Sequence, residues 1–150
     1  MSKALERGAG ILLPISSLPS PYGIGTMGRD AYDFVDMLKR AGQKYWQVLP
    51  IGPTSFGDSP YQSFSAFAGN PYFIDLDTLI AEGLLKKEEV ESYNWADSDD
   101  EIDYARIYRQ RFEVLRKAFG RSEHKDSRDY VDFIEENEQW IDDYALYMAI

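Results

Sequence analysis

Polar and aromatic side chains are concentrated in one short stretch of the sequence, Asp58-Ser59-Pro60-Tyr61-Gln62, which offers a carboxylate, two hydroxyls and an amide. Three aromatic residues flank it: Phe56, Phe64 and Phe67. Flat aromatic faces stack on the C–H surfaces of sugar rings, and side chains with fixed donors and acceptors read sugar hydroxyls. We therefore interpret Ser59 and Tyr61 as ligand contacts and the phenylalanines as core packing. Asp58 has a simpler explanation as the cap of a turn.

This stretch lies inside a long non-periodic segment, residues 50–75, which is rich in proline, glycine and aromatic residues. A loop of this length without regular structure is uncommon in a compact domain, and such loops usually carry function. The segment follows a short apolar run at residues 45–49. In a parallel βα architecture, the loop after a strand lies on the face where active sites are built. We therefore expect the rest of the chain to position this loop.

The residues before the loop predict a strand, a helix and a second strand. Residues 10–15 form a continuous apolar run ended by proline, which indicates a strand buried on both faces. Apolar residues recur every three or four positions over residues 29–41, as in an amphipathic helix, and Gly42 suits the C′ position. Residues 44–49 predict the second strand. This order favours a parallel βαβ unit with a right-handed crossover.

The residues after the loop predict helices joined by polar segments. In order, we expect an extended segment over 72–76, a turn capped by Asp77 and ending at Ala81, a short helix over 84–93 and an acidic linker over 94–103. A longer helix should begin at Tyr104 and stop at Gly120. A second apolar stripe runs from Tyr130 to Met148, and Asn137 interrupts it with either a break or a kink. Two helices joined by a polar segment are expected to pair antiparallel.

The charge and composition of the chain disfavour several classes of partner. The formal net charge is −10 and the pI about 4.5, whereas a nucleic-acid site needs clustered lysine and arginine. The same acidity disfavours an anionic membrane surface. The chain has no cysteine, which fits a reducing compartment, and no apolar stretch approaches the ~20 residues of a membrane span. We expect a cytoplasmic protein with neither a nucleic-acid nor a membrane partner.

Three other patterns have simpler explanations than a functional site. Residues 23–28 match G-x-G-x-x-G, but residues 16–22 separate them from the strand and no acidic residue ends the second strand, which disfavours a dinucleotide site. His124 has no second histidine or cysteine at ligand spacing, so we expect a solvated loop residue and no metal. Acidic pairs such as Asp99-Asp100 and Asp142-Asp143 are expected on solvent-facing surfaces.

The end of the sequence predicts that the chain is the leading piece of a longer protein. The run from Trp140 to Ile150 stops in mid-pattern without a glycine, proline or basic residue to end a helix. Two parallel strands with one crossover helix also cannot close an α/β sheet, since parallel sheets need cover on both faces. The alternative is that Ile150 packs on a partner or frays.

Four segments of the sequence carry a resemblance to a known family: RGAGILLPISSLPSPYGIGTMG, KYWQVLPIGPT, FGDSPYQSFSAFAGNPYFIDLD and WIDDYALYMAI. Together they resemble the N-terminal part of the amylomaltases, the 4-α-glucanotransferases that are also called disproportionating enzymes. The resemblance covers essentially the whole chain. The third segment is the most specific because it is long, gapless and unusual in composition, whereas residues 84–128 resemble the family only in their pattern.

The resemblance implies an α/β fold, the start of a (β/α)8 TIM barrel of the α-amylase clan. Residues 1–75 would hold the first βαβ part with its substrate loop, and residues 76–150 a mostly helical inserted subdomain. It implies transfer of an α-1,4-glucan segment to the 4-hydroxyl of a glucose or glucan acceptor, through a retaining glycosyl-enzyme mechanism. Neither a metal nor an organic cofactor is implied.

At the level of residues, the resemblance implies that Ser59 and Tyr61 line the cleft for α-1,4-glucans and maltooligosaccharides. Asp58 and Phe56 are further candidate contacts. Some members have tyrosine where Phe56 stands, at a secondary glucan site, so stacking is kept here while the hydroxyl is lost. The three acids of the family come from later barrel strands and match no position of this sequence. We therefore expect the catalytic residues beyond Ile150 and no activity from these residues alone.

Two alternatives to the glucanotransferase interpretation stay open. The first is a non-catalytic module that binds maltooligosaccharides or another partner through the same loop. The second is a nucleotide-dependent enzyme that uses residues 23–28, which ranks behind because the context of that motif is wrong.

Overall fold

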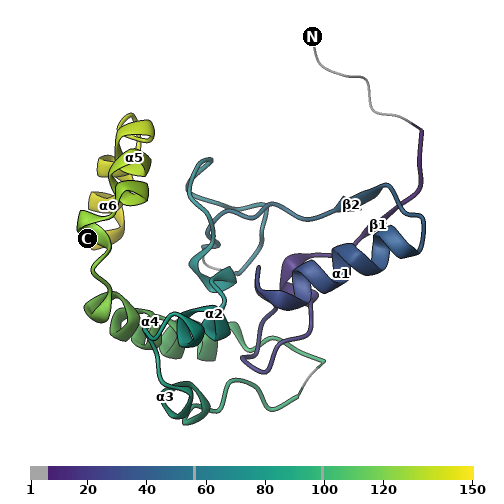
Figure 1. The fold of residues 1–150 in the computed structure, drawn as a ribbon, viewed down its shortest axis with the longest axis horizontal. Coiled ribbons are helices and arrows are strands. Elements are labelled where there is room, and N and C mark those ends of the chain that lie inside the picture. The colour runs from purple at the N-terminus through teal and green to yellow at the C-terminus, as the bar shows by residue number, and fades with distance from the viewer. Residues whose placement is uncertain (1–6, 56, 99) are drawn as a thin grey trace.

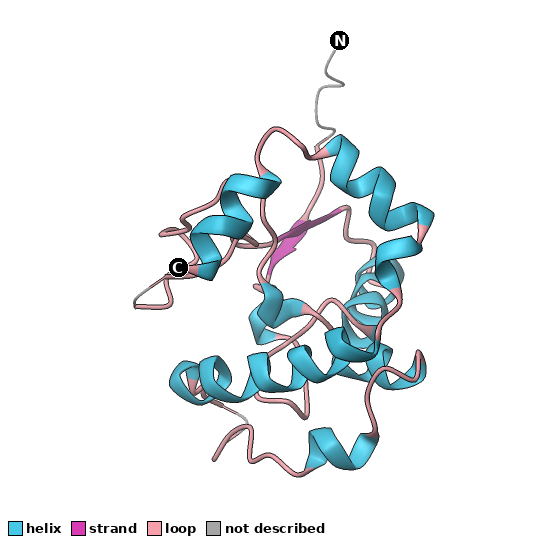
Figure 2. Cartoon of the chain, turned by 90° about the vertical axis from the view of Figure 1, so that its left-hand side faces the viewer, coloured by secondary structure: helices cyan, strands magenta, loops and turns pink. Residues whose placement is uncertain are grey.

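The computed structural model describes residues 7–55, 57–98 and 100–150. It shows a small parallel sheet, a long irregular loop and a helical part that ends in two helices set apart from the sheet (Figure 1). The elements are β1 (Gly10–Leu12), α1 (Arg29–Arg40), β2 (Tyr45–Gln47), α2 (Leu76–Ala81), α3 (Lys87–Glu91), α4 (Tyr104–Arg121), α5 (Arg128–Glu136) and α6 (Ile141–Ala149). Short 3-10 turns lie at Ile15–Ser17, Pro71–Phe73 and His124–Asp126. Figure 2 shows how small a share of the chain the strands occupy.

β1 and β2 pair in parallel, with Ile11 opposite Trp46. The Trp46 indole N–H donates a hydrogen bond to the backbone oxygen of Leu13 at 2.8 Å. From α1, Phe34 contacts the Trp46 ring edge-on, with centroids 4.9 Å apart. Both strands are shorter than predicted, and β1 is not buried on both faces, since Leu12 is 56% exposed. A sheet of two strands with one crossover helix has only one covered face, which accounts for the difference.

The helix boundaries agree with the sequence prediction at α1 and differ at α2. Gly42 follows the C-cap of α1 with a φ of 72°, the left-handed conformation that glycine adopts at C′. The N-cap of α2 is Asp75 rather than Asp77, because the Asp75 carboxylate accepts the backbone N–H of Thr78 at 2.7 Å. The residues before it, predicted as extended, form the 3-10 turn Pro71–Phe73.

α4 continues through Gly120, which the sequence prediction placed at its end. A glycine inside a helix costs only about 1 kcal/mol relative to alanine, and here the extended backbone of Ser122 terminates the helix one residue after Arg121. His124 then lies between two aromatic rings, Phe119 and Tyr130, with centroids 4.9 Å from each. His124 therefore lies in a connecting turn, as predicted, but its ring is half-buried rather than fully solvated, because it packs α4 against the start of α5.

The second apolar stripe is broken rather than kinked at Asn137, which is the C-cap of α5. Its side-chain amide donates to the backbone oxygen of Phe133 at 2.7 Å, which satisfies one of the free carbonyls at the helix end. The predicted antiparallel pairing is not found, because α5 and α6 rise from one end of α4 instead of lying along it (Figure 1). The short 3-10 turn between α4 and α5 sets this direction.

The main core lies among the helices and not at the sheet. Its buried members are Tyr22, Ile24, Tyr72, Leu76, Leu85, Val90, Trp95, Ile107, Val114 and Ala118. Tyr22 and Ile24 come from the loop after β1 and Tyr72 from the end of the long loop, so α4 packs directly against the two segments that follow the strands. Within the described ranges, no helix has the length and apolar content required to cross a membrane.

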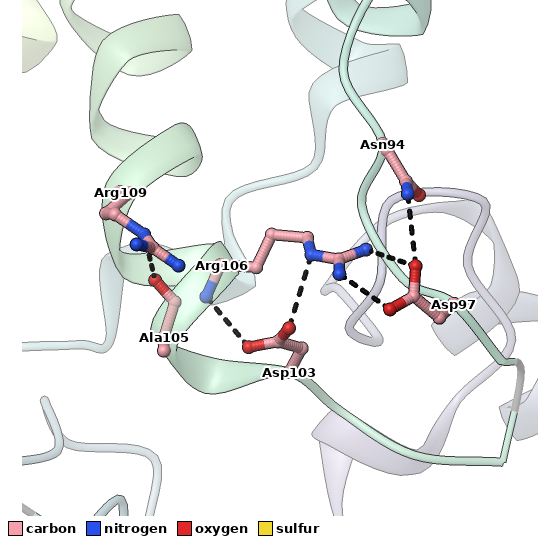
Figure 3. A network of polar contacts seen from close by, with 6 residues as sticks. All are labelled: Asn94, Asp97, Asp103, Ala105, Arg106 and Arg109. Carbon is pink, nitrogen blue, oxygen red and sulfur yellow. Dashed lines mark hydrogen bonds and ion pairs between the residues drawn. The ribbon is translucent and has the colours of Figure 1, made fainter.

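The acidic linker before α4 is fixed to the first turn of that helix (Figure 3). Arg106 donates to both carboxylate oxygens of Asp97, at 2.8 and 2.7 Å, and pairs with Asp103 at 3.2 Å. Asn94 also donates to Asp97, at 3.1 Å. These hydrogen bonds, with that of Arg106 first, lower the pKa of Asp97 to about 2. The predicted non-helical linker is thus held by charge-assisted contacts.

Candidate functional site

The long loop between β2 and α2 is closed at its base by Asn70. The backbone N–H of Asn70 donates to the backbone oxygen of Ile51 at 2.8 Å, which joins the two ends of the loop. Its side-chain oxygen accepts the N–H of Tyr72 at 3.0 Å and so caps the turn that follows. Asn70 is only 7% exposed, and buried polar groups need such partners. Hydrogen bonds of Asn70 therefore hold the base of the loop together.

Two consecutive turns end at Asp58 and at Gln62. The N–H of Asp58 donates to the backbone oxygen of Ser55 at 3.0 Å, and the N–H of Gln62 donates to that of Ser59 at 3.1 Å. The Ser55 hydroxyl donates to the backbone oxygen of Gln62 at 3.1 Å and ties the turns together. Asp58 has a φ of 55°, a left-handed conformation that costs a non-glycine residue about 1–3 kcal/mol. Asp58 thus shapes the first turn through its backbone.

Ser59 and Tyr61, the predicted sugar contacts, lie on the second turn. The Tyr61 ring is 72% exposed and open to a ligand. The Ser59 hydroxyl accepts the N–H of Tyr61 at 3.3 Å, which leaves its own proton free to donate. The turn thus presents an open aromatic face and a hydroxyl donor side by side, a combination suited to a sugar ring and its hydroxyls.

Asp58 is half-buried, unlike the exposed Tyr61. It lines a cavity of about 110 Å³ between this loop and the segments that follow β1 and β2, together with Ser16, Thr54 and Tyr104. Burial raises the pKa of the Asp58 carboxyl. The Thr54 hydroxyl is buried without a hydrogen-bond partner among the described residues. The lining is mostly apolar, including Ile15 and Phe73, so the few polar groups in it, those of Asp58 and Thr54 among them, lie in a largely apolar setting.

Phe64 and Phe67 are not core residues, which corrects the sequence prediction. They are 38% and 72% exposed. The Phe64 ring stacks against Tyr144 of α6, with centroids 6.3 Å apart, and the Phe67 ring stacks against Trp140, with centroids 5.6 Å apart. Rings in a surface loop pack on the nearest aromatic helix instead of reaching the main core, and α6 begins beside this loop. Phe56, the third flanking phenylalanine, lies outside the described residues.

One residue that fixes the loop was missed by the sequence prediction: Arg111 of α4. It is fully buried, and its guanidinium donates to the backbone oxygens of Tyr72, at 3.0 Å, and of Ile74. A signal was present in the sequence, because Ile107, Arg111 and Val114 share the apolar face of the helix at spacings of four and three. A charged residue on such a face requires a buried partner.

The family model described as 4-alpha-glucanotransferase matches residues 13–150, including the whole loop with Ser59 and Tyr61. The chain belongs to the 4-alpha-glucanotransferase family. The resemblance inferred from the four sequence segments is thereby confirmed.

Solved and curated members of the 4-alpha-glucanotransferase family agree closely with the chain. The 4-alpha-glucanotransferase of Clostridium butyricum is 57% identical over 136 residues, which is 91% of this chain and 28% of that protein. That of Thermus thermophilus is 46% identical and covers 97% of this chain and 29% of its own length. The structure of the amylomaltase from Streptococcus agalactiae in complex with acarbose has a TM-score of 0.89 at 46% identity, covering 96% of this chain and 29% of that one. The chain therefore spans less than a third of the length of these relatives.

Proposed function

We propose that this chain forms the substrate-loop part of a 4-alpha-glucanotransferase. Such an enzyme transfers a segment of an α-1,4-glucan to the 4-hydroxyl of a glucose or glucan acceptor, through a retaining glycosyl-enzyme intermediate. The observation that carries the proposal is the family match over residues 13–150, which includes a loop whose Tyr61 ring is open to a ligand. The complex of the Streptococcus agalactiae amylomaltase with acarbose supports it.

The same proposal covers the architecture. Residues 1–75 hold the first βαβ part of a (β/α)8 barrel, and residues 76–150 hold a helical subdomain packed beside it. The parallel pairing of β1 and β2 supports this. So does the cavity in which Ser16, after β1, and Asp58, after β2, meet, because the carboxyl ends of parallel strands share the edge where barrel enzymes build their sites.

Each loop residue has a separate role in this proposal. Tyr61 stacks on a glucose ring of the glucan, and Ser59 donates a hydrogen bond to a sugar oxygen. Asp58 maintains the turn from inside, through its backbone and its place in the wall of the cavity. None of these three residues carries a catalytic role, since the resemblance matches none of the family's three acids to a position of this sequence.

Binding of maltoheptaose to the purified chain tests the proposal, with titration followed by NMR or calorimetry. We expect Tyr61→Ala to weaken binding at least tenfold, which corresponds to about 1.4 kcal/mol. The matched control is Tyr32→Ala on α1, because Tyr32 is 73% exposed and Tyr61 72%. Equal affinities in the two variants would rule out Tyr61 as a glucan contact.

An activity assay separates the proposed contribution to an enzyme from the alternative of a non-catalytic binding module. We expect the 150-residue chain to bind maltotriose without converting it to glucose and longer dextrins. Clear disproportionation by the chain would contradict the assignment of the acids to other residues of the enzyme. Recovery of transfer activity when the chain is supplied with the rest of a related enzyme would favour the enzyme over the binding module.

A further inference from the structure

Arg111 is an unusual residue for the centre of the helical core. It is 0% exposed and lies on the apolar face of α4, one turn from the equally buried Ile107 and Val114. Its Nη2 group donates to the backbone oxygen of Tyr72 at 3.0 Å and to that of Ile74. These two carbonyls lie where the long loop ends and α2 begins.

The surroundings of Arg111 do not favour a buried charge for stability alone. No ion pair joins it to a carboxylate within the described part of the chain, and its Nε and Nη1 groups have no hydrogen-bond partner there. Asp75 acts only at longer range, and the Trp95 ring lies 5.8 Å from the guanidinium carbon. Burial lowers the pKa of Arg111 to about 10, so the group remains charged at neutral pH. An apolar residue of similar volume would often be as stable at such a site.

A continuous set of hydrogen bonds leads from Arg111 to both ends of the loop. Arg111 holds the backbone oxygen of Tyr72, and the N–H of Tyr72 donates to the side chain of Asn70 at 3.0 Å. The N–H of Asn70 donates in turn to Ile51, at the start of the loop. The N–H of Met27, in the segment before α1, reaches the same turn through the backbone oxygen of Phe73 at 3.0 Å.

We propose that Arg111 is a positioning residue for glucan binding, which from α4 fixes the exit of the substrate loop and thereby the place of Ser59 and Tyr61. The inference rests on the proposed function of that loop. The guanidinium suits this role because it offers several donors in a rigid, planar arrangement, and one group can therefore hold two carbonyls at a fixed separation. The helical part of the chain then does more than cover the barrel part, because it sets the geometry of the ligand-binding loop.

The test compares Arg111→Met, Arg111→Lys and the control Val114→Ala in the full 150-residue chain. Val114 is equally buried on the same helix and makes no side-chain hydrogen bond to the loop. Amide hydrogen exchange at Asn70, Tyr72 and Phe73 is measured under conditions of matched global stability. We expect exchange at least tenfold faster in Arg111→Met than in Val114→Ala, with Arg111→Lys between them because it keeps the charge and one donor group. Equal rates in the Met and Ala variants would overturn the inference.

The second measurement is the dissociation constant for maltoheptaose in the same variants. We expect it to rise at least fivefold in Arg111→Met, to recover partly in Arg111→Lys and to stay unchanged in Val114→Ala. Faster exchange with unchanged affinity would overturn the link to glucan binding. If the unmodified chain does not bind maltoheptaose, the proposed function fails, while the exchange rates still decide whether Arg111 holds the loop. Should Arg111→Met not fold, Arg111→Lys carries the comparison, with at least threefold faster exchange than Val114→Ala expected and an equal rate overturning the inference.

Discussion

Replacing Asn70 with alanine should destabilise the chain by about 1–3 kcal/mol, because it leaves a buried backbone donor without a partner. The backbone hydrogen bond to Ile51 is kept, but the N–H of Tyr72 loses its acceptor at 3.0 Å. Tyr72 is only 6% exposed, so water cannot replace the lost oxygen. An average cap costs about 1 kcal/mol when it is changed to alanine, and burial places this one above the average. For a chain of this length, about 2 kcal/mol lowers the melting temperature by about 4–8 °C.

Urea titration followed by far-ultraviolet circular dichroism measures this loss, and Ser127→Ala supplies the matched control. The Ser127 hydroxyl caps α5 by the same kind of bond, accepting the N–H of Tyr130 at 3.2 Å, but it is exposed to water. We expect Ser127→Ala to lower the free energy of unfolding by about 0.5–1 kcal/mol. The dependence of that free energy on urea concentration should be the same in both variants. If Asn70→Ala costs no more than Ser127→Ala, burial of the cap does not contribute and the reasoning about the base of the loop is wrong.

Three further predictions concern the core, the surface charges and the aromatic contacts. Ile107→Ala, at a fully buried site, should lower the free energy of unfolding by about 2–5 kcal/mol in the same titration. Hydrogen bonds from Arg121 lower the pKa of Glu89 from 4.5 to about 2, so this pair stabilises the fold above pH 4.5 and loses its contribution as the pH falls towards 2. In Glu89→Gln, the midpoint of urea unfolding should depend less on pH over that range than it does in the unmodified chain. Phe67→Ala should shift the fluorescence of Trp140, which its ring contacts, and cost about 0.5–1.5 kcal/mol.

The elements of this fold that depend on local pattern could be predicted from the sequence, and those that depend on a distant partner could not. The period of α1 and the glycine after it are local features, and so is the interruption at Asn137, which the sequence left open as a break or a kink. The choice between Asp75 and Asp77 as the N-cap of α2 is not. The hydroxyl of Thr26 donates to Asp75 at 2.7 Å, whereas Asp77 accepts the hydroxyl of Tyr22 at 2.5 Å. Both donors lie in the loop after β1. Contacts with that distant loop therefore decide that Asp75 caps α2 and that Asp77 binds Tyr22.

The residues of the candidate site also fall into those suggested by local pattern and those that depend on a distant partner. Residue types alone led to Ser59 and Tyr61 as sugar contacts, because a hydroxyl and an aromatic ring in a loop suit a sugar, and this stays a prediction. They did not show that the phenylalanines of the loop contact α6, since an aromatic side chain suits a core and a surface cluster equally. The role of Arg111 depends on backbone oxygens 37 and 39 positions away, and nothing in a linear pattern identifies such an acceptor.

The long loop therefore has an inner and an outer side that serve different purposes. Asp58 and Asn70 line the inner cavity and determine the shape of the loop, whereas Tyr61 lies on the outer side with most of its surface open. Asp58 also adopts a backbone conformation that costs energy, and such a conformation persists only where the surrounding contacts impose it. Substitutions on the inner side should first change stability and those on the outer side should first change glucan affinity. We expect substitutions of Asn70 and Arg111 to change both, because under the proposed function a loss of loop order is also a loss of binding.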